Sequence, residues 1–133
     1  MDLTQVDFGA FGSQCGYQIV QWEPGLAVIH MPIAAWMLNR SGLPHGGIIA
    51  ALIDTVAGFA GTHYTPPEPR PLGLTLSMST TFLARAEGKT LVATARRTGG
   101  GRSIFFSRVE VTDELGTLVA TGECTYRHRQ NAQ

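Results

Sequence analysis

The sequence is poor in charged residues. Acidic and basic side chains make up 15% of the 133 residues, and ten of one sign balance ten of the other. A chain with no excess of cations has little with which to hold a phosphate backbone, so we expect no nucleic-acid partner. A charge fraction below the usual quarter also indicates that part of the surface is covered by a partner chain.

Long apolar runs and metal-binding spacings are absent as well. Asp54 and several glycines interrupt the longest apolar stretch, so we expect no membrane span. The first seven residues have neither a basic start nor an apolar run, which predicts no signal peptide and a cytoplasmic location. Cys15 and Cys124 lie far apart and are predicted to be reduced thiols. The four histidines match no ligand spacing, so we expect no metal and no cofactor.

Length and periodicity predict one α+β domain over residues 1–133. Apolar residues are 44% of the chain, enough for a substantial core. One long helix, beginning at Gly46 and Gly47 and running to about Thr62, is expected to pack against a single antiparallel sheet. Strands are predicted at 17–22, 26–31, 72–83, 90–98, 102–112 and 117–126, with the last four forming a meander.

The strand predicted at 72–83 alternates strictly between apolar and small polar residues. This pattern predicts an apolar face on which the helix lies and an opposite face rich in hydroxyl groups. Thr75, Ser77 and Ser79 would then share the hydroxyl face.

A strip of small residues on the central helix carries one carboxylate. Asp54 is the only acid or base between His45 and His63. A carboxylate on an apolar helix must pair, accept hydrogen bonds or serve as a general base. The strip itself, which permits close approach of another backbone or a ligand, consists of Gly47, Ala50, Ala51, Asp54, Ala57, Gly58 and Gly61.

The start of the helix has the chemistry of an oxyanion site. Unpaired N–H groups and the positive end of the helix dipole face outward at Gly46 and Gly47, and glycine allows a ligand oxygen to come close. Each feature also has a structural explanation when taken singly, since a buried aspartate can cap a helix or bridge a subunit contact.

The combination of these residues is more specific. Asn39 precedes His45 by six residues, Gly46 and Gly47 follow it directly, and Asp54 lies nine residues after it. This pattern resembles the hotdog-fold acyl-CoA thioesterases of the PaaI-like type, in the 4-hydroxybenzoyl-CoA thioesterase superfamily. The resemblance implies an antiparallel sheet wrapped around one long central helix. It also implies a homodimer with active sites at its interface, and pairing of two dimers into a homotetramer.

The same resemblance implies hydrolysis of an acyl-CoA thioester to a free acid and CoA, with no cofactor. The Gly46 N–H would bind the thioester oxygen, and Asn39 would position the carbonyl or the thiol side. His45 would orient the loop near the leaving sulfur. Asp54 of the opposing subunit would act as general base on water or as nucleophile. Thr75 would help to hold the water, although the sequence leaves open which hydroxyl of Thr75, Ser77 and Ser79 faces the site.

Binding of the CoA portion is predicted at a second region. Arginine forks suit phosphate oxygens, and the Gly-Arg-Ser of 101–103 resembles a turn near the CoA path in the family. A solvated hairpin tip is the alternative. The predicted substrate-binding residues are Gly47, Arg96, Arg97, Arg102 and Ser103.

Other functions are compatible with the same fold. A hydratase or dehydratase would need a different sequence motif around His45. A non-catalytic acyl-CoA sensor would not need Asp54, and a purely structural dimer would leave the glycines without a role. The acyl group stays open between aryl, such as phenylacetyl, and medium-chain types. Candidate lining residues are Trp36, Phe59, Tyr64, Met78 and Phe82.

Overall fold

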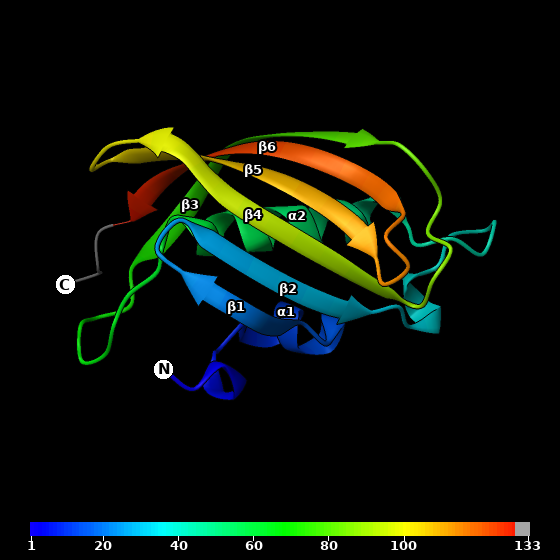
Figure 1. The fold of residues 1–133 in the computed structure, drawn as a ribbon, viewed down its shortest axis with the longest axis horizontal. Coiled ribbons are helices and arrows are strands. Elements are labelled where there is room, and N and C mark those ends of the chain that lie inside the picture. The colour runs from blue at the N-terminus through cyan, green and yellow to red at the C-terminus, as the bar shows by residue number, and fades with distance from the viewer. Residues whose placement is uncertain (130–133) are drawn as a thin grey trace.

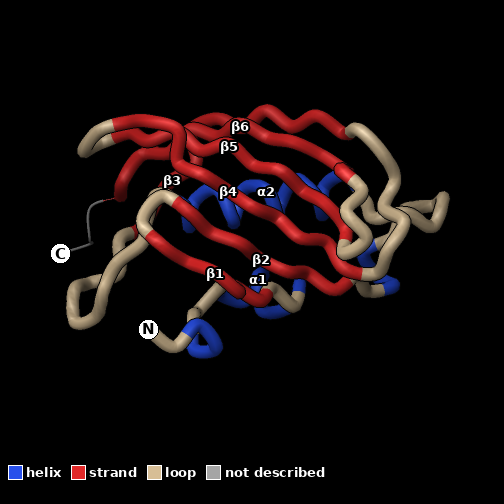
Figure 2. Tube along the Cα trace, in the orientation of Figure 1, coloured by secondary structure: helices blue, strands red, loops and turns tan. Residues whose placement is uncertain are grey.

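A strongly curved, six-stranded antiparallel sheet wraps around helix α2 in the computed structural model, which describes residues 1–129 (Figure 1). Figure 2 shows α2 behind β4 and β5, enclosed by the curve of the sheet. Within the described residues, no helix is long and apolar enough to cross a membrane. The elements are η1 (Leu3–Gln5), α1 (Gly9–Cys15), β1 (Gln18–Glu23), β2 (Leu26–Pro32), η2 (Ala35–Met37), α2 (Gly46–Ala60), β3 (Leu72–Phe82), β4 (Thr90–Gly100), β5 (Ile104–Asp113) and β6 (Leu118–Arg129).

The order of the strands corrects one prediction. The sheet runs β1-β2-β4-β5-β6-β3, so only β4, β5 and β6 form a meander. Strand β3 crosses to the far edge, where it pairs with β6, and β2 takes the place beside β4. Turn residues at 87–88 had predicted a hairpin between β3 and β4. A turn sets where a strand ends but does not select the strand's partner, which explains the error.

The core lies between α2 and the strands β2, β4 and β5. Leu52, Ile53 and Val56 of the helix are fully buried, and alternate residues of the three strands face them. Burial of this apolar face stabilises a helix whose glycines would otherwise disfavour it. The predicted helix is confirmed, with an end at Ala60 rather than near Thr62.

Strand β3 differs from its neighbours because almost none of it is buried. Leu72, Leu74 and Met78 are 40–52% exposed, so the helix does not bury the apolar face of this strand as predicted. Only the end of the face approaches the helix, where the Phe82 ring lies against Gly46. The register between β3 and β6 also shifts between Thr75 and Ser77. Such a bulge reverses the side chain alternation, so the residues before and after it no longer share a face.

The small-residue strip of α2 is filled largely from within the chain. A Cβ at Gly61 would lie 2.1 Å from Cε2 of Phe105, and one at Gly58 would lie 3.4 Å from Cε1 of Tyr126. The predicted close approach of another backbone or a ligand is therefore corrected at these two glycines, where aromatic rings from β5 and β6 occupy the space.

Candidate active site

The start of α2 presents one free backbone donor. His45 is the N-cap residue, and its Nδ1 accepts the Gly47 N–H at 2.9 Å. The Gly46 N–H, by contrast, makes no hydrogen bond to any residue between 1 and 129. A neutral imidazole that accepts at Nδ1 carries its proton on Nε2, so His45 has a donor left over. Of the two predicted glycines, Gly46 has an amide without a partner among residues 1–129, and Gly47 donates its amide to His45.

The loop before the helix is organised by Asn39. Its Oδ1 accepts the N–H groups of Ser41 at 2.9 Å and Leu43 at 3.1 Å, and its main-chain N–H donates to the Leu43 carbonyl at 2.7 Å. This Asx-type turn explains why asparagine precedes the motif. With Oδ1 engaged in the loop, the side chain offers its Nδ2 donors outward.

A second group of polar side chains surrounds Asp54. Its Oδ1 accepts the Thr75 hydroxyl at 2.7 Å and the Tyr126 hydroxyl at 2.9 Å. The Tyr126 hydroxyl also donates to the main-chain carbonyl of Asp54. No hydrogen bond to Oδ2 is present within the described part of the chain. Asp54 is half-buried on the middle of α2, so the free oxygen is available to a ligand.

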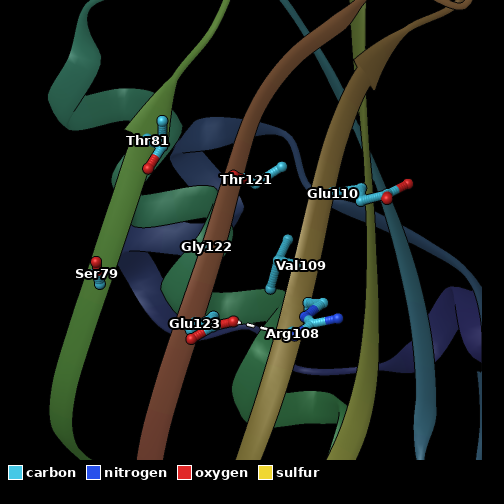
Figure 3. Close-up of a pocket in the computed structure, with 8 residues that line it drawn as sticks. All are labelled: Ser79, Thr81, Arg108, Val109, Glu110, Thr121, Gly122 and Glu123. Atoms are coloured by element: carbon cyan, nitrogen blue, oxygen red, sulfur yellow. Dashed lines mark hydrogen bonds and ion pairs between the residues drawn. The ribbon is translucent and has the colours of Figure 1, made fainter.

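The bulge in β3 decides which hydroxyl meets Asp54. Thr75 stands before the shift and contacts the carboxylate. Ser79, after the shift, lines a hollow with Arg108 and Glu123 on the outer face of the sheet, with α2 behind the strands (Figure 3). Ser77 lines a neighbouring hollow with the same two charged residues. The predicted common face for the three hydroxyls is therefore wrong, although the choice of Thr75 agrees with the geometry.

The Gly46 amide and the Asp54 carboxylate lie apart within one chain. Asn39 and Gly46 line a hollow of about 380 Å³. Asp54 and Thr75 line a different one of about 230 Å³. Eight residues of helix separate Gly46 from Asp54, which places them roughly 12 Å apart along the axis at 1.5 Å per residue. Within one chain, Gly46 and Asp54 thus line two separate hollows.

The predicted phosphate-binding arginines do not form one cluster. Arg96 lines an outer hollow with Arg108 and Glu110. The Arg97 guanidinium donates to the carbonyl oxygens of Gly99 and Gly101 and lies 5.6 Å from the centre of the Phe105 ring. The Arg97 side chain is therefore engaged with the backbone of residues 99–101. The prediction that three guanidinium groups surround one site is wrong. The other members of the set, Arg102 and Ser103, are exposed in the turn between β4 and β5.

The five candidate residues for an acyl pocket do not gather in one place. Phe59 lines the hollow beside Asp54, and Phe82 lines the one beside Gly46. Tyr64 packs against Trp22, whereas Trp36 and Met78 are 58% and 40% exposed. Among residues 1–129, no three side chains of histidine, cysteine, aspartate or glutamate gather as metal ligands would.

Tyr126 is the residue that the sequence analysis missed. It lies 72 positions from Asp54 and reaches it only because β6 pairs with β3. Its place in an alternating strand pattern is that of an ordinary core aromatic residue. No local pattern in the sequence could have distinguished it.

Comparison with known proteins identifies a family for the chain. The family model described as "Thioesterase superfamily" matches residues 41–127. Human "Acyl-coenzyme A thioesterase 13" is 28% identical over 109 residues, covering 80% of this chain and 76% of that protein. The "1,4-dihydroxy-2-naphthoyl-CoA hydrolase" of Listeria monocytogenes is 26% identical over 110 residues, covering 83% and 88%.

Solved structures agree with the architecture. The conserved protein PA5202 of Pseudomonas aeruginosa superposes with a TM-score of 0.82 at 26% identity, covering 92% of this chain and 95% of that one. The E. coli PaaI protein, from the phenylacetic acid degradation operon, gives a TM-score of 0.80 at 22% identity, covering 92% and 86%, which bears on the fold alone. Together, the family match and these superpositions confirm the predicted hotdog fold.

Proposed function

This chain belongs to the thioesterase superfamily, and from that membership we propose that it hydrolyses an acyl-CoA thioester to the free acid and CoA. Relatives that are named as an acyl-CoA thioesterase and as a naphthoyl-CoA hydrolase support an acyl-CoA substrate. The observation that carries the proposal is the presence, in separate hollows of one chain, of the Gly46 amide and the Asp54 carboxylate. Neither the Gly46 N–H nor Oδ2 of Asp54 makes a hydrogen bond within residues 1–129. One group suits a developing oxyanion and the other suits water or direct attack.

Each of the two hollows would supply part of the reaction. The Gly46 N–H, aided by the helix dipole, would donate to the thioester carbonyl oxygen as its negative charge grows. Asn39 would offer Nδ2 to the same region. The His45 Nε2–H would lie toward the sulfur that leaves as the CoA thiolate and is then protonated. Gly47 would act indirectly, because its amide holds His45 in place.

Asp54 would act through Oδ2. As a general base, it would take a proton from water while the water oxygen attacks the carbonyl carbon and the C–S bond breaks. As a nucleophile, Oδ2 would itself form a bond to that carbon while the C–S bond breaks and CoA leaves as the thiolate, which is then protonated. Water would next hydrolyse the resulting anhydride, releasing the free acid and restoring the Asp54 carboxylate. Thr75 would hold the carboxylate in either case, since its hydroxyl binds Oδ1.

A second copy of the chain would complete the site. The separation of Gly46 from Asp54 supports a site in which the oxyanion donor of one chain faces the carboxylate of another. The exposed leucines of β3, an edge strand beside Asp54, offer an apolar surface for that contact. We therefore propose a homodimer with two sites at its interface, and pairing of dimers into a tetramer.

Several finer assignments belong to the same proposal. The acyl group would be aryl, such as phenylacetyl, or of medium chain length. CoA enters as substrate, with no separate cofactor. Arg102 and Ser103, both exposed in the turn between β4 and β5, remain the proposed contacts for its phosphates. The protein would act in the cytoplasm.

A mixing experiment tests the chemistry and the dimer together. Gly46→Pro removes the free N–H at a position where proline fits a helix start, and the extended backbone of His45 suits a following proline. Gly46→Ala is the matched control, because it retains the N–H. Thiol release is measured from a panel of aryl- and alkyl-CoA thioesters for Asp54→Asn, Gly46→Pro and both subunits refolded together.

We expect either variant alone to be nearly inactive and the mixture to recover activity. Equal mixing gives half heterodimers, each with one intact site of two, so recovery should approach about a quarter of the wild-type rate. Absence of recovery would contradict the interface site. Saturable binding of CoA esters by the wild-type protein, without thiol release from any of them, would instead indicate a sensor.

A further inference from the structure

Two hydroxyl groups from neighbouring strands meet on a single carboxylate oxygen. Thr75 of β3 and Tyr126 of β6 are directly paired across the sheet, and both donate to Oδ1 of Asp54, at 2.7 and 2.9 Å. Two donors on one oxygen limit rotation of the carboxylate about its own axis. The other oxygen, Oδ2, is thereby held in one direction and left without a donor from residues 1–129.

The Tyr126 hydroxyl has a second acceptor in the main-chain carbonyl of Asp54. One proton is therefore shared between the carbonyl and Oδ1. If the carboxylate gains a proton or becomes part of an anhydride, the hydroxyl can turn fully to the carbonyl and stays hydrogen-bonded. A buried donor left without an acceptor would be unfavourable, and this arrangement avoids that state throughout the reaction.

The surroundings of Tyr126 favour the neutral, hydrogen-bond-donating form of its phenol. Burial, followed by the negative charge of Asp54, raises the pKa of the Tyr126 phenol well above its ordinary value. The phenol is therefore unsuited to act as a base or to carry charge itself. Its contribution to the reaction is the direction and the constancy of a hydrogen bond.

The ring of Tyr126 is held by close packing. It is 3% exposed and stacks on Phe105 with 5.0 Å between ring centres and 13° between planes. Gly58 of α2 and Gly73 of β3 lie against its edges, where an added Cβ would come within 3.4 and 3.6 Å of the ring. An added Cβ at either glycine would be in van der Waals contact with the ring, so α2 and β3 both pack closely on Tyr126 and restrict its movement.

We propose that Tyr126 is a positioning residue for thioester hydrolysis, orienting Asp54 so that Oδ2 faces the substrate carbonyl or the attacking water. The proposal rests on the function proposed above. It assigns no contact with substrate to Tyr126, because the hydroxyl is occupied by Asp54 and the ring is buried.

Tyr126→Phe removes the hydroxyl and keeps the ring. Loss of a hydrogen bond to a charged group should lower kcat by about 10- to 100-fold, with KM little changed because substrate binding is untouched. Tyr17→Phe is the matched control. Tyr17 is also buried, at 6% exposure, and its hydroxyl has no hydrogen-bond partner among the described residues. This control should retain the wild-type kcat.

A combined variant separates positioning from a general loss of structure. If Tyr126 acts through Asp54, adding Tyr126→Phe to Asp54→Asn should lower thiol release no further. A further loss in the double variant, or a wild-type kcat in Tyr126→Phe, would overturn the proposal while leaving the hydrolase function intact. If wild-type protein releases thiol from no substrate, both the function and this proposal fall.

A spectroscopic readout covers the case in which Tyr126→Phe does not fold. The sequence contains three tyrosines, so 3-fluorotyrosine in a Tyr17→Phe/Tyr64→Phe background labels Tyr126 alone. We expect its ¹⁹F resonance to move when Asp54→Asn is introduced, because the hydroxyl loses its charged acceptor. An unmoved resonance would contradict the hydrogen bond and hence the proposed role.

Discussion

Asp54 is half-buried and Asp113 is buried, and the two carboxylates differ in the hydrogen bonds that they accept. Oδ2 of Asp113 accepts the backbone N–H groups of Glu87 and Gly88 at 2.8 and 2.9 Å. Its Oδ1 accepts those of Leu115 and Thr117 at 3.0 and 2.9 Å. Asp54 has donors on one oxygen only, and these donors are side chain hydroxyls. Both oxygens of Asp113 therefore accept hydrogen bonds, whereas Oδ2 of Asp54 accepts none from residues 1–129.

The difference separates a structural carboxylate from a reactive one. Burial alone would raise the pKa of Asp113, but the backbone N–H groups of Thr117, Glu87, Gly88 and Leu115 hold that pKa below its ordinary value. Such a group ties two turns together and has no oxygen left for chemistry. A buried aspartate that only supports the fold, which was one alternative for Asp54, is what Asp113 exemplifies.

The largest expected effect is on Asp54. Asp54→Asn should lower kcat by about 10²- to 10⁴-fold, because the amide is neither a base nor a nucleophile. The thermal midpoint and the oligomeric state should remain near those of the wild type, since asparagine retains an acceptor for Thr75 and Tyr126. Steady-state thiol release and a thermal melt measure the two quantities. A lost dimer with normal activity per folded site would make Asp54 structural, like Asp113.

Asp113→Asn should show the opposite behaviour. It replaces one acceptor oxygen by an NH₂ group that faces two backbone donors, so the thermal midpoint should fall while kcat per folded site is retained. The fall is measured by thermal melts and kcat by active-site-normalised thiol release. A large loss of kcat in the folded variant would contradict a purely structural role for Asp113.

The pH dependence of stability follows from the same carboxylate. The pKa of Asp113 in the folded chain lies below its ordinary value of 3.8, so its contribution to stability is present above that value. That contribution should diminish as the pH falls through the folded pKa. Melts of Asp113→Asn should lack this part of the acid dependence, and an unchanged difference from wild type down to low pH would contradict the assignment.

The smallest expected effect concerns one donor to Asp54. Thr75→Val removes a single hydroxyl while Tyr126 still holds the same oxygen, so kcat should fall by about 10-fold without a change in the thermal midpoint. Ser77→Ala, two residues along the strand but beyond the bulge, should have no effect on kcat. Equal losses in the two variants would mean that the bulge does not separate their roles.

Prediction from the sequence succeeded where the interacting residues are close in the chain. Asn39, His45 and Gly46 form their loop and helix start through contacts within nine residues. The predicted hairpin at the N-terminal end of the sheet was confirmed as β1 and β2, because a short turn joins strands that pair with each other.

Prediction failed where strand pairing was decisive. Strict alternation put Thr75 and Ser77 on one face, and the bulge that separates them has no clear marker in an alternating sequence. The three arginines near 99–101 are close in sequence, yet Arg96 and Arg97 face opposite sides of the sheet because successive side chains of a strand alternate.

By itself, the sequence determined the central helix, its His-Gly-Gly start, the positions of the turns and the place of Asp54 on the helix. These features depend on local propensity, capping and periodicity, which act within a few turns of chain. Only the tertiary structure decided that β3 lies at the far edge beside β6 and that Thr75 and Tyr126 meet on one oxygen of Asp54. Backbone hydrogen bonds between strands are nearly the same for any partner, so the choice among partners comes from the packing of the whole core.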